Sequence, residues 1–241
     1  MENYKLDSLK KDLEALHILL DEKQLSQFVK YYELLTEWNQ VMNLTTITDF
    51  DEVCKKHFID SLSLIKAYDI ASVKTMIDVG TGAGFPGIPL KIAFPDLQVT
   101  LLDSLNKRVH FLQTVIDELS LERIDAIHGR AEDFAAKGQL REKYDICVSR
   151  AVANLSTLCE YCIPYVKVGG YFISYKAEKI TDEILNAKKA MSLLGAKLDK
   201  QVEFVIPYTE INRNLLVIHK YKKTPANYPR KAGVPSKKPL M

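Results

Sequence analysis

The sequence predicts an α/β fold: a seven-stranded, mostly parallel sheet with helices on both faces, preceded by an N-terminal helical cap. Three observations lead to this prediction. Leucine and aromatic residues recur at helical spacing through residues 1–70, short apolar runs then alternate with amphipathic stretches, and a glycine-rich turn follows the first of those runs. A length of 241 residues suits one such domain with an added element.

The N-terminal segment, residues 1–70, has the periodicity of helices. Its first apolar set is Leu6, Leu9, Leu13, Leu16 and Leu20, at steps of three and four residues. A second set consists of Leu25, Phe28, Tyr32, Leu35 and Met42, around Trp38. We expect these helices to form a cap packed on the domain that follows.

Seven β-type apolar runs follow from residue 74 onward. They are TMIDVG, QVTLLD, RIDAIHG, YDICVSR, GGYFISYK, KQVEFVIPY and NLLVIHKY. Amphipathic stretches such as 105–119 and 153–166 lie between the first five, and 180–194 precedes the sixth. The last two runs follow each other without a helix, which predicts an antiparallel pair at one edge of the sheet. We assign residues 71–221 to this domain.

The composition is that of an ordinary globular protein, with 47% hydrophobic and 27% charged residues. No apolar run approaches the length of a membrane span, and the start of the chain lacks the apolar core of a signal peptide. We therefore expect a cytoplasmic protein outside the membrane. Cys159 and Cys162 form a C-x-x-C pair without further zinc ligands, inside a predicted apolar helix, so we expect buried structural cysteines and no metal site.

The C-terminal tail, residues 222–241, is basic. From residue 220 onward the chain has seven basic residues and no acidic one, which leaves 26 basic against 31 acidic residues elsewhere. Such asymmetry indicates a polyanionic partner, and Tyr221 and Tyr228 could stack on unpaired bases. The prolines between the lysines predict an extended, mobile segment. The alternative is a solvated end that only aids solubility.

The glycine-rich segment after the first predicted strand, IDVGTGAGFPGIPL, fits two ligand-binding patterns. Gly82, Gly84 and Gly87 match the G-x-G-x-x-G of dinucleotide binding. Asp78 and Gly80, with the first two of these glycines, match the D-x-G-x-G-x-G of nucleoside-binding methyltransferases. A dinucleotide site needs its first glycine at the end of the strand, and Gly82 lies beyond it. The register therefore favours a methyltransferase, with S-adenosylmethionine as its ligand.

Three polar side chains follow later strands of the predicted sheet. Asp103 ends the second strand, where a carboxylate can bind both ribose hydroxyls; the alternative is a helix N-cap. Glu132 follows the third strand, where related folds place a residue against adenine. Arg150 ends the fourth strand, where it suits a phosphate, a base edge or a carboxylate; the alternative is a surface ion pair.

Six segments together resemble one known family. They are NLTTITDFDEVCKKHFIDSL, IDVGTGAGFPGIPL, VTLLDSLNKRVHFL, GRAEDF, SRAVA and YPRKAGVPSKKPL. They are similar to RsmG, also called GidB, the bacterial methyltransferases that modify N7 of a guanine in the 530 loop of 16S ribosomal RNA. The resemblance covers nearly the whole chain. It implies a Rossmann-like, class I S-adenosylmethionine-dependent methyltransferase fold acting on 16S rRNA within the small ribosomal subunit, and we expect a monomer.

The same resemblance implies which residues hold the cofactor. The set is Gly80, Phe85, Asp103, Ala131, Glu132 and Arg150. The cap and the tail would face the RNA. Guanine N7 carries a lone pair and no proton, so its methylation needs no general base; His57 is the nearest rival for one.

Two other classes of function stay open. One is a methyltransferase acting on a small molecule or a protein, which would leave the basic tail without a purpose. The other is a nucleotide-binding module or NAD enzyme that uses Gly82, Gly84 and Gly87.

Overall fold

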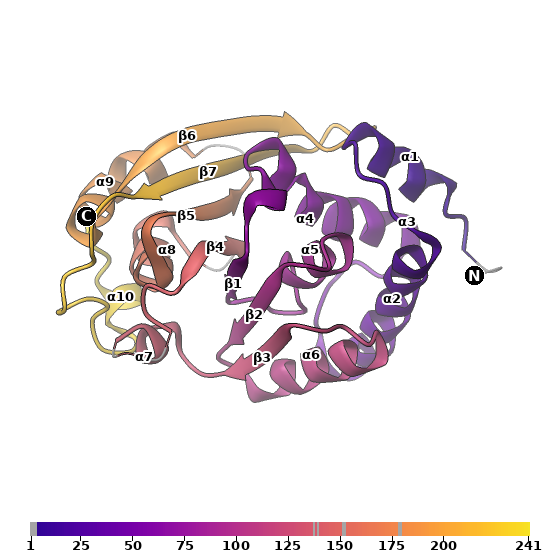
Figure 1. Cartoon of the computed structure of the whole chain (residues 1–241), viewed down its shortest axis with the longest axis horizontal. Coiled ribbons are helices and arrows are strands. Elements are labelled where there is room, and N and C mark those ends of the chain that lie inside the picture. Colours follow the sequence, from indigo (N-terminus) through magenta and orange to yellow (C-terminus); the bar gives the residue numbers. More distant parts are fainter. Residues whose placement is uncertain (1–3, 137, 139, 151–152, 178–179) are drawn as a thin grey trace.

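A seven-stranded sheet runs through the molecule in the order β3-β2-β1-β4-β5-β7-β6 (Figure 1). The computed structural model describes residues 4–136, 138, 140–150, 153–177 and 180–241. The strands are β1 (Thr75–Val79), β2 (Gln98–Asp103), β3 (Ile124–His128), β4 (Tyr144–Arg150), β5 (Val166–Lys176), β6 (Ala196–Val205) and β7 (Asn212–Lys220). Strands β1 to β5 pair in parallel. The predicted mostly parallel sheet is confirmed.

The last two strands form the predicted antiparallel pair at one edge. Strand β7 is inserted between β5 and β6 and is antiparallel to both. The chain therefore places its last strand inside the sheet and leaves β6 at the edge. The arrangement explains why β7 is almost wholly buried whereas β6 alternates between exposed and half-buried residues.

Helices cover both faces of the sheet. One face carries α2 (Glu22–Met42), α5 (Gly87–Ala93) and α6 (Asn106–Glu118), and the other carries α7 (Ala131–Ala136), α8 (Leu155–Cys162) and α9 (Thr181–Leu194). Adjacent strand residues face opposite cores: Ile146 and Val148 contact the first, and Cys147 the second. This alternation produces two apolar cores, one on each side of the sheet.

The cap consists of short helices around α2. They are α1 (Asp7–Ala15), α3 (Phe50–Val53), a π-helical turn (Cys54–Ile59) and α4 (Asp60–Leu62), followed by 3₁₀ turns at Ser63–Lys66 and Ile70–Ser72. Helix α2 begins with a capping box, in which Asp21 and Gln24 each accept a hydrogen bond from the other's backbone N–H. The Gln24 amide also donates to the Ile92 carbonyl at 2.7 Å, which attaches the cap to α5.

The C-terminal tail is folded against the body, so the prediction of an extended, mobile segment is wrong. It contains α10 (Val234–Lys237) and lies beside α7 and α8 (Figure 1). Arg230 pairs with the fully buried carboxylate of Glu160, with Nη2 at 2.6 Å from Oε2. Arg141 donates to the carbonyls of Thr224 and Tyr228, each at 2.7 Å. The prediction was based on the prolines and charges of the tail. The composition does not reveal that Glu160 and Arg141, far away in the sequence, bind the tail.

All four cysteines are free thiols in the protein interior, as predicted for Cys159 and Cys162. Burial raises the pKa of both of these thiols, which keeps them protonated. Within the described part of the chain, no group of three or more His, Cys, Asp or Glu side chains could hold a metal ion. None of the helices described there is long and apolar enough to cross a membrane.

Candidate active site

The glycine-rich loop between β1 and α5 forms the floor of the site. Gly82 has φ +63°, and a Cβ there would meet nothing within 4 Å, so its backbone is open to an approaching ligand. Gly84 has φ +99°, and a Cβ there would lie 2.5 Å from Ile88 Cδ1 and 2.8 Å from the Tyr31 hydroxyl. The Tyr31 hydroxyl in turn donates to the Ala83 carbonyl. Tyr31 of the cap thus holds the glycine-rich loop at Ala83. The residues on either side of Ala83, Gly82 and Gly84, both have a positive φ that requires glycine.

Asp78, in β1, holds the glycine-rich loop through two hydrogen bonds. Its Oδ2 accepts hydrogen bonds from the Thr81 hydroxyl at 2.7 Å and from the Gly87 N–H at 2.9 Å. Burial raises the pKa of this carboxyl to about 7. The Gly87 N–H, at the first turn of α5, is therefore used within the loop. A pyrophosphate would need such an N–H, so the geometry opposes the dinucleotide interpretation.

Asp103 ends β2 beside the loop and is buried. Its Oδ2 accepts from the Gly82 N–H at 2.9 Å, and its Oδ1 accepts from the Leu105 N–H at 2.9 Å. Arg108 lies 3.5 Å from Oδ2. The helix N-cap alternative is wrong, because the N-cap residue of α6 is Leu105 and no side chain caps this helix. Asp103 instead binds the backbone N–H of Leu105 and presents its carboxylate to the cavity over the glycine loop.

Three neighbouring cavities follow the ends of the strands. The first, of about 260 Å³, is lined by Gly80, Ser104, Ala131, Glu132, Tyr161, Gly233 and Ser236 among others. The second, of about 360 Å³, lies over the glycine loop and shares Gly80 and Ser104 with the first. The third, of about 320 Å³, shares His57 and Arg150 with the second. A ligand that fills the first two cavities would reach His57 and Arg150, which also line the third cavity.

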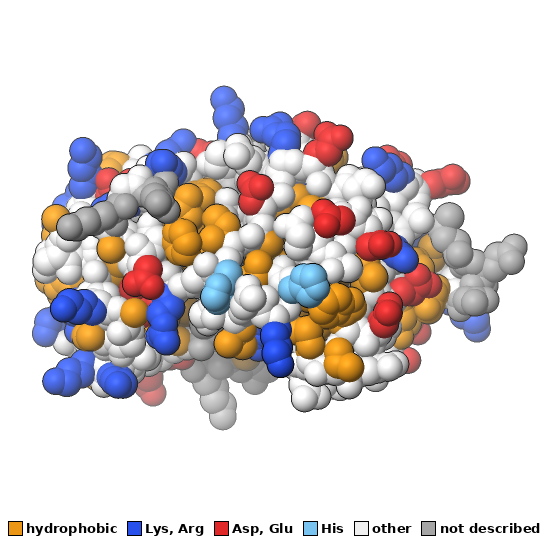
Figure 2. Space-filling view, turned by 90° about the horizontal axis from the view of Figure 1, so that it is seen from below, with side chains coloured by type: hydrophobic (Ala, Val, Ile, Leu, Met, Phe, Trp, Pro, Cys, Tyr) orange, Lys and Arg blue, Asp and Glu red, His pale blue; other side chains and the backbone are white. Residues whose placement is uncertain are grey.

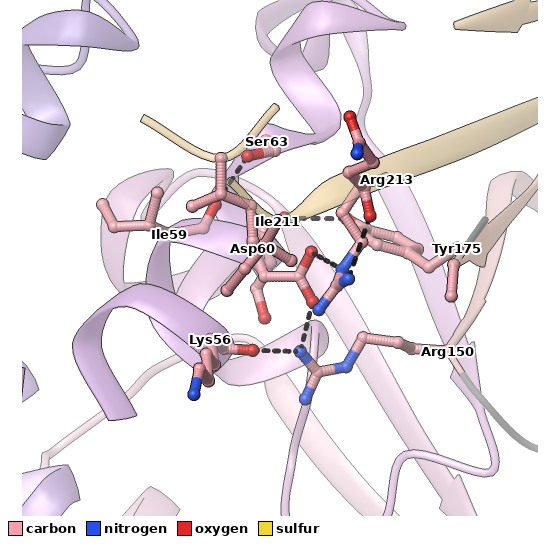
Figure 3. Close-up of polar contacts among 12 residues, drawn as sticks. Lys56, Ile59, Asp60, Ser63, Arg150, Tyr175, Ile211 and Arg213 are labelled. Carbon is pink, nitrogen blue, oxygen red and sulfur yellow. Dashed lines mark hydrogen bonds and ion pairs between the residues drawn. The ribbon is translucent and has the colours of Figure 1, made fainter. Parts of the chain in front are cut away.

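Arg150 joins the sheet to the cap at this border (Figure 3). Its Nη1 lies 2.9 Å from Asp60 Oδ2 and 3.2 Å from the Lys56 carbonyl. Arg213, at the start of β7, donates from Nε to the other oxygen of Asp60 at 3.0 Å. Asp60 is almost fully buried between the two guanidinium groups. Arg150 also lies over the Phe85 ring, 5.0 Å from its centroid.

His57, in the π-helical turn of the cap, packs against the glycine-rich loop. Its ring stacks on Phe85 with centroids 4.6 Å apart, and Nε2 lies 2.8 Å from the Thr45 hydroxyl. Its Nδ1 lies 3.1 Å from the Lys56 carbonyl oxygen and 3.2 Å from Arg150 Nη2. Burial first, and then the charge of Arg150, lower the pKa of His57 to about 4.

The structure brings the sequence-predicted site residues together around two of these cavities. Gly80, Ala131 and Glu132 line the first cavity, and Gly80, Phe85, Asp103 and Arg150 line the second. Of the SRAVA segment, residues 151 and 152 lie outside the described residues. Sequence reasoning missed Asp60 and Arg213. Their signal was weak: a lone acid on an apolar helical stretch, and an arginine at the start of an apolar strand.

Comparison with known proteins identifies close relatives of this chain. The model of a family described as rRNA small subunit methyltransferase G (GidB) matches residues 24–215. A ribosomal RNA small subunit methyltransferase G of Lachnoclostridium phytofermentans is 56% identical over 229 residues, 95% of each chain. Its counterpart from Acetivibrio thermocellus is 53% identical over 92% of this chain and 90% of the relative.

Solved structures share the fold at low identity. A mitomycin 7-O-methyltransferase is 12% identical with a TM-score of 0.55, over 78% of this chain and 60% of that one. The S-adenosylmethionine-dependent methyltransferase SibL is 15% identical with a TM-score of 0.52, over 67% of this chain and 55% of that one. The predicted fold class, that of Rossmann-like class I methyltransferases, is confirmed.

Proposed function

Because the chain belongs to the family of ribosomal RNA small subunit methyltransferase G, we propose that it methylates N7 of a guanine in the 530 loop of 16S rRNA. The methyl donor would be S-adenosylmethionine, and the substrate the small ribosomal subunit. The observation that carries the proposal is the row of adjoining cavities across the glycine loop. The first two cavities offer room for the nucleoside and the amino-acid part of S-adenosylmethionine. The third, beyond Arg150, offers room for the guanine base of the RNA.

The residues around the first two cavities fit S-adenosylmethionine. Asp103 presents a buried carboxylate for the ribose hydroxyls, although it already accepts two backbone hydrogen bonds. The open backbone at Gly82, together with Gly80, leaves room for the methionine part. Ala131 and Glu132 would border the adenine. Phe85 and Arg150 would close the site at the reacting end.

The work of this chain would be alignment and exclusion of water. S-adenosylmethionine supplies a methyl group on a positively charged sulfur. Guanine N7 has a lone pair and no proton, so no side chain needs to remove one. His57 fits this mechanism, because a pKa near 4 leaves it neutral and its Nδ1 lies against Lys56 and Arg150. It would position Phe85 and Arg150 by stacking and hydrogen bonding.

The RNA would approach over the cap and the tail. Figure 2 shows Lys and Arg side chains gathered toward the end of the molecule that holds the tail. Of the basic tail residues, Lys222, Lys223, Lys231, Lys237 and Lys238 are exposed. Lys220 and Arg230 are paired with Glu142 and Glu160, so they would not contact phosphate. We propose a cap of residues 1–70, a methyltransferase domain of residues 71–221 and a tail of residues 222–241.

The test uses small ribosomal subunits from cells that lack this protein. Incubation with the purified chain and labelled S-adenosylmethionine should yield one 7-methylguanine in the 530 loop, found by mass mapping of the 16S rRNA. The single-turnover rate should be flat from about pH 6 to 9, since no group must lose a proton. Label on another atom, or a rate that rises tenfold per pH unit, would contradict the N7 assignment.

A further inference from the structure

We propose that residues 230–238 of the tail form a wall of the first cavity and are needed for full affinity for the nucleoside part of the cofactor. The inference rests on the proposed function, because it takes the ligand of this cavity to be S-adenosylmethionine. It assigns the tail a second role beside any contact with RNA. Three sets of contacts carry it.

The tail is anchored on the side of the molecule where this cavity opens. Arg230 donates to Glu160 Oε1 from its backbone N–H at 2.7 Å and from its Nε at 2.9 Å. Its Nη2 reaches back to the Lys238 carbonyl at 2.8 Å, which closes residues 230–238 into a loop. The Thr157 hydroxyl donates to the Pro235 carbonyl at 3.2 Å. Both Glu160 and Pro235 are buried, so this loop is part of the folded body.

The anchored loop touches a residue of the predicted adenine site. The backbone N–H of Gly233 donates to Glu132 Oε1 at 2.8 Å. Glu132 is only 5% exposed and lines the first cavity. Its carboxylate is therefore oriented by the tail, from 101 residues further along the chain.

The same loop encloses the cavity itself. Gly233 and Ser236 line it together with Gly80 and Leu102, which lie at the carboxyl ends of β1 and β2. Tyr161 of α8 lines it as well; burial raises the pKa of this tyrosine, and a hydrogen bond with the Ser236 side chain opposes the rise. A chain without the tail would lose one wall of this cavity and the partner of Glu132. The nucleoside would then lie in a more open, more solvated site.

A substitution that fills the cavity from the tail tests this inference. Ser236→Trp places a large ring at a cavity-lining position that is exposed, so the fold should tolerate it. Binding of S-adenosylhomocysteine, measured by titration calorimetry on the full chain, should weaken about tenfold or more. Truncation after Lys223 should weaken it by a similar factor.

The matched control is Lys237→Trp, the same ring on the next exposed residue, which does not line the cavity. It should change the affinity less than about twofold and leave the melting temperature equal to that of Ser236→Trp. Unchanged affinity of Ser236→Trp would overturn the inference, whatever the truncated chain does. Failure of the full-length protein to bind S-adenosylhomocysteine at all would instead overturn the proposed function.

Discussion

At the scale of single residues, Asp103 combines backbone contacts with a place at the candidate site. Its carboxylate holds the backbone of Gly82 and Leu105, and it also borders the cavity over the loop. We expect Asp103→Ala to weaken S-adenosylmethionine binding about 10- to 100-fold, through the lost charge-assisted hydrogen bonds to ribose. The same change should lower stability by about 1–3 kcal/mol, because two backbone donors lose their acceptor.

Asp103→Asn separates these effects. The amide keeps one oxygen for a backbone N–H but has no charge. In calorimetric titration, Asp103→Asn should show most of the loss of S-adenosylmethionine affinity that Asp103→Ala shows. In thermal unfolding, Asp103→Asn should lose less stability than Asp103→Ala. Equal affinity of the wild type and both variants would leave Asp103 with a structural role only.

His57 predicts a pH dependence of stability. Its pKa is about 4 in the folded protein and near 6.5 when unfolded, so the unfolded chain binds the extra proton between these values. The stability that neutral His57 contributes is complete above pH 6.5 and is lost as the pH falls toward 4, by up to about 3 kcal/mol.

Urea unfolding of the wild type and of His57→Gln across this range gives the measurement. The difference in unfolding free energy between the two proteins should shrink as the pH falls. The raised pKa of Asp78 acts in the opposite direction, but it is common to both proteins and cancels in the difference. A difference that stays constant with pH would show that His57 keeps an ordinary pKa.

At the scale of elements, the tail makes the sharpest prediction. Arg230→Ala leaves the fully buried carboxylate of Glu160 without its cation. The expected cost in unfolding free energy is about 3–5 kcal/mol, as for other broken buried pairs. Urea unfolding measures it, with Lys231→Ala as the control on the exposed neighbour. If the tail were detached in solution, both variants would have the stability of the wild type.

The elements also show how far the sequence could predict the structure. Apolar runs bounded by turns were sufficient for all seven strands, since the period and burial of a strand are local properties. The glycine loop and Asp103 were expected near one another, and the structure shows both lining one cavity, because parallel strands end at one edge. The conformation of the tail was not predictable in this way. It depends on Glu160, which lies 70 residues before Arg230, and local composition carries no trace of that pairing.

At the scale of the whole molecule, Asp60 ties together three parts of the chain. It belongs to the cap, Arg150 to the end of β4 and Arg213 to the start of β7 (Figure 3). We expect Asp60→Asn to loosen the cap from the sheet, because two guanidinium groups lose their shared charge. Hydrogen exchange should accelerate by about tenfold or more in residues 54–66 and stay unchanged in β3.

Glu52→Gln is the control for this variant. It removes an acid from the same part of the cap, but Glu52 forms only a partly exposed ion pair with Lys56 one helical turn away. Such pairs contribute little to stability. Exchange in the cap should therefore be close to that of the wild type, and equal exchange in both variants would contradict the bridging role of Asp60.

The hairpin of β6 and β7 contacts helix α1, near the N-terminus of the chain. The turn between these strands lies beside α1 (Figure 1), and the ammonium group of Lys11 in α1 lies 4.1 Å from the centroid of the Tyr208 ring in this turn. Arg213, at the start of β7, contacts Asp60. Synthesis runs from the N-terminus, so the first helices emerge long before these partners exist. During that interval the helices of the cap can only collapse on one another or on the growing sheet. A chain halted before residue 208 would lack both Tyr208, the partner of Lys11, and Arg213, the partner of Asp60, so residues late in the sequence stabilise the first segments of the chain.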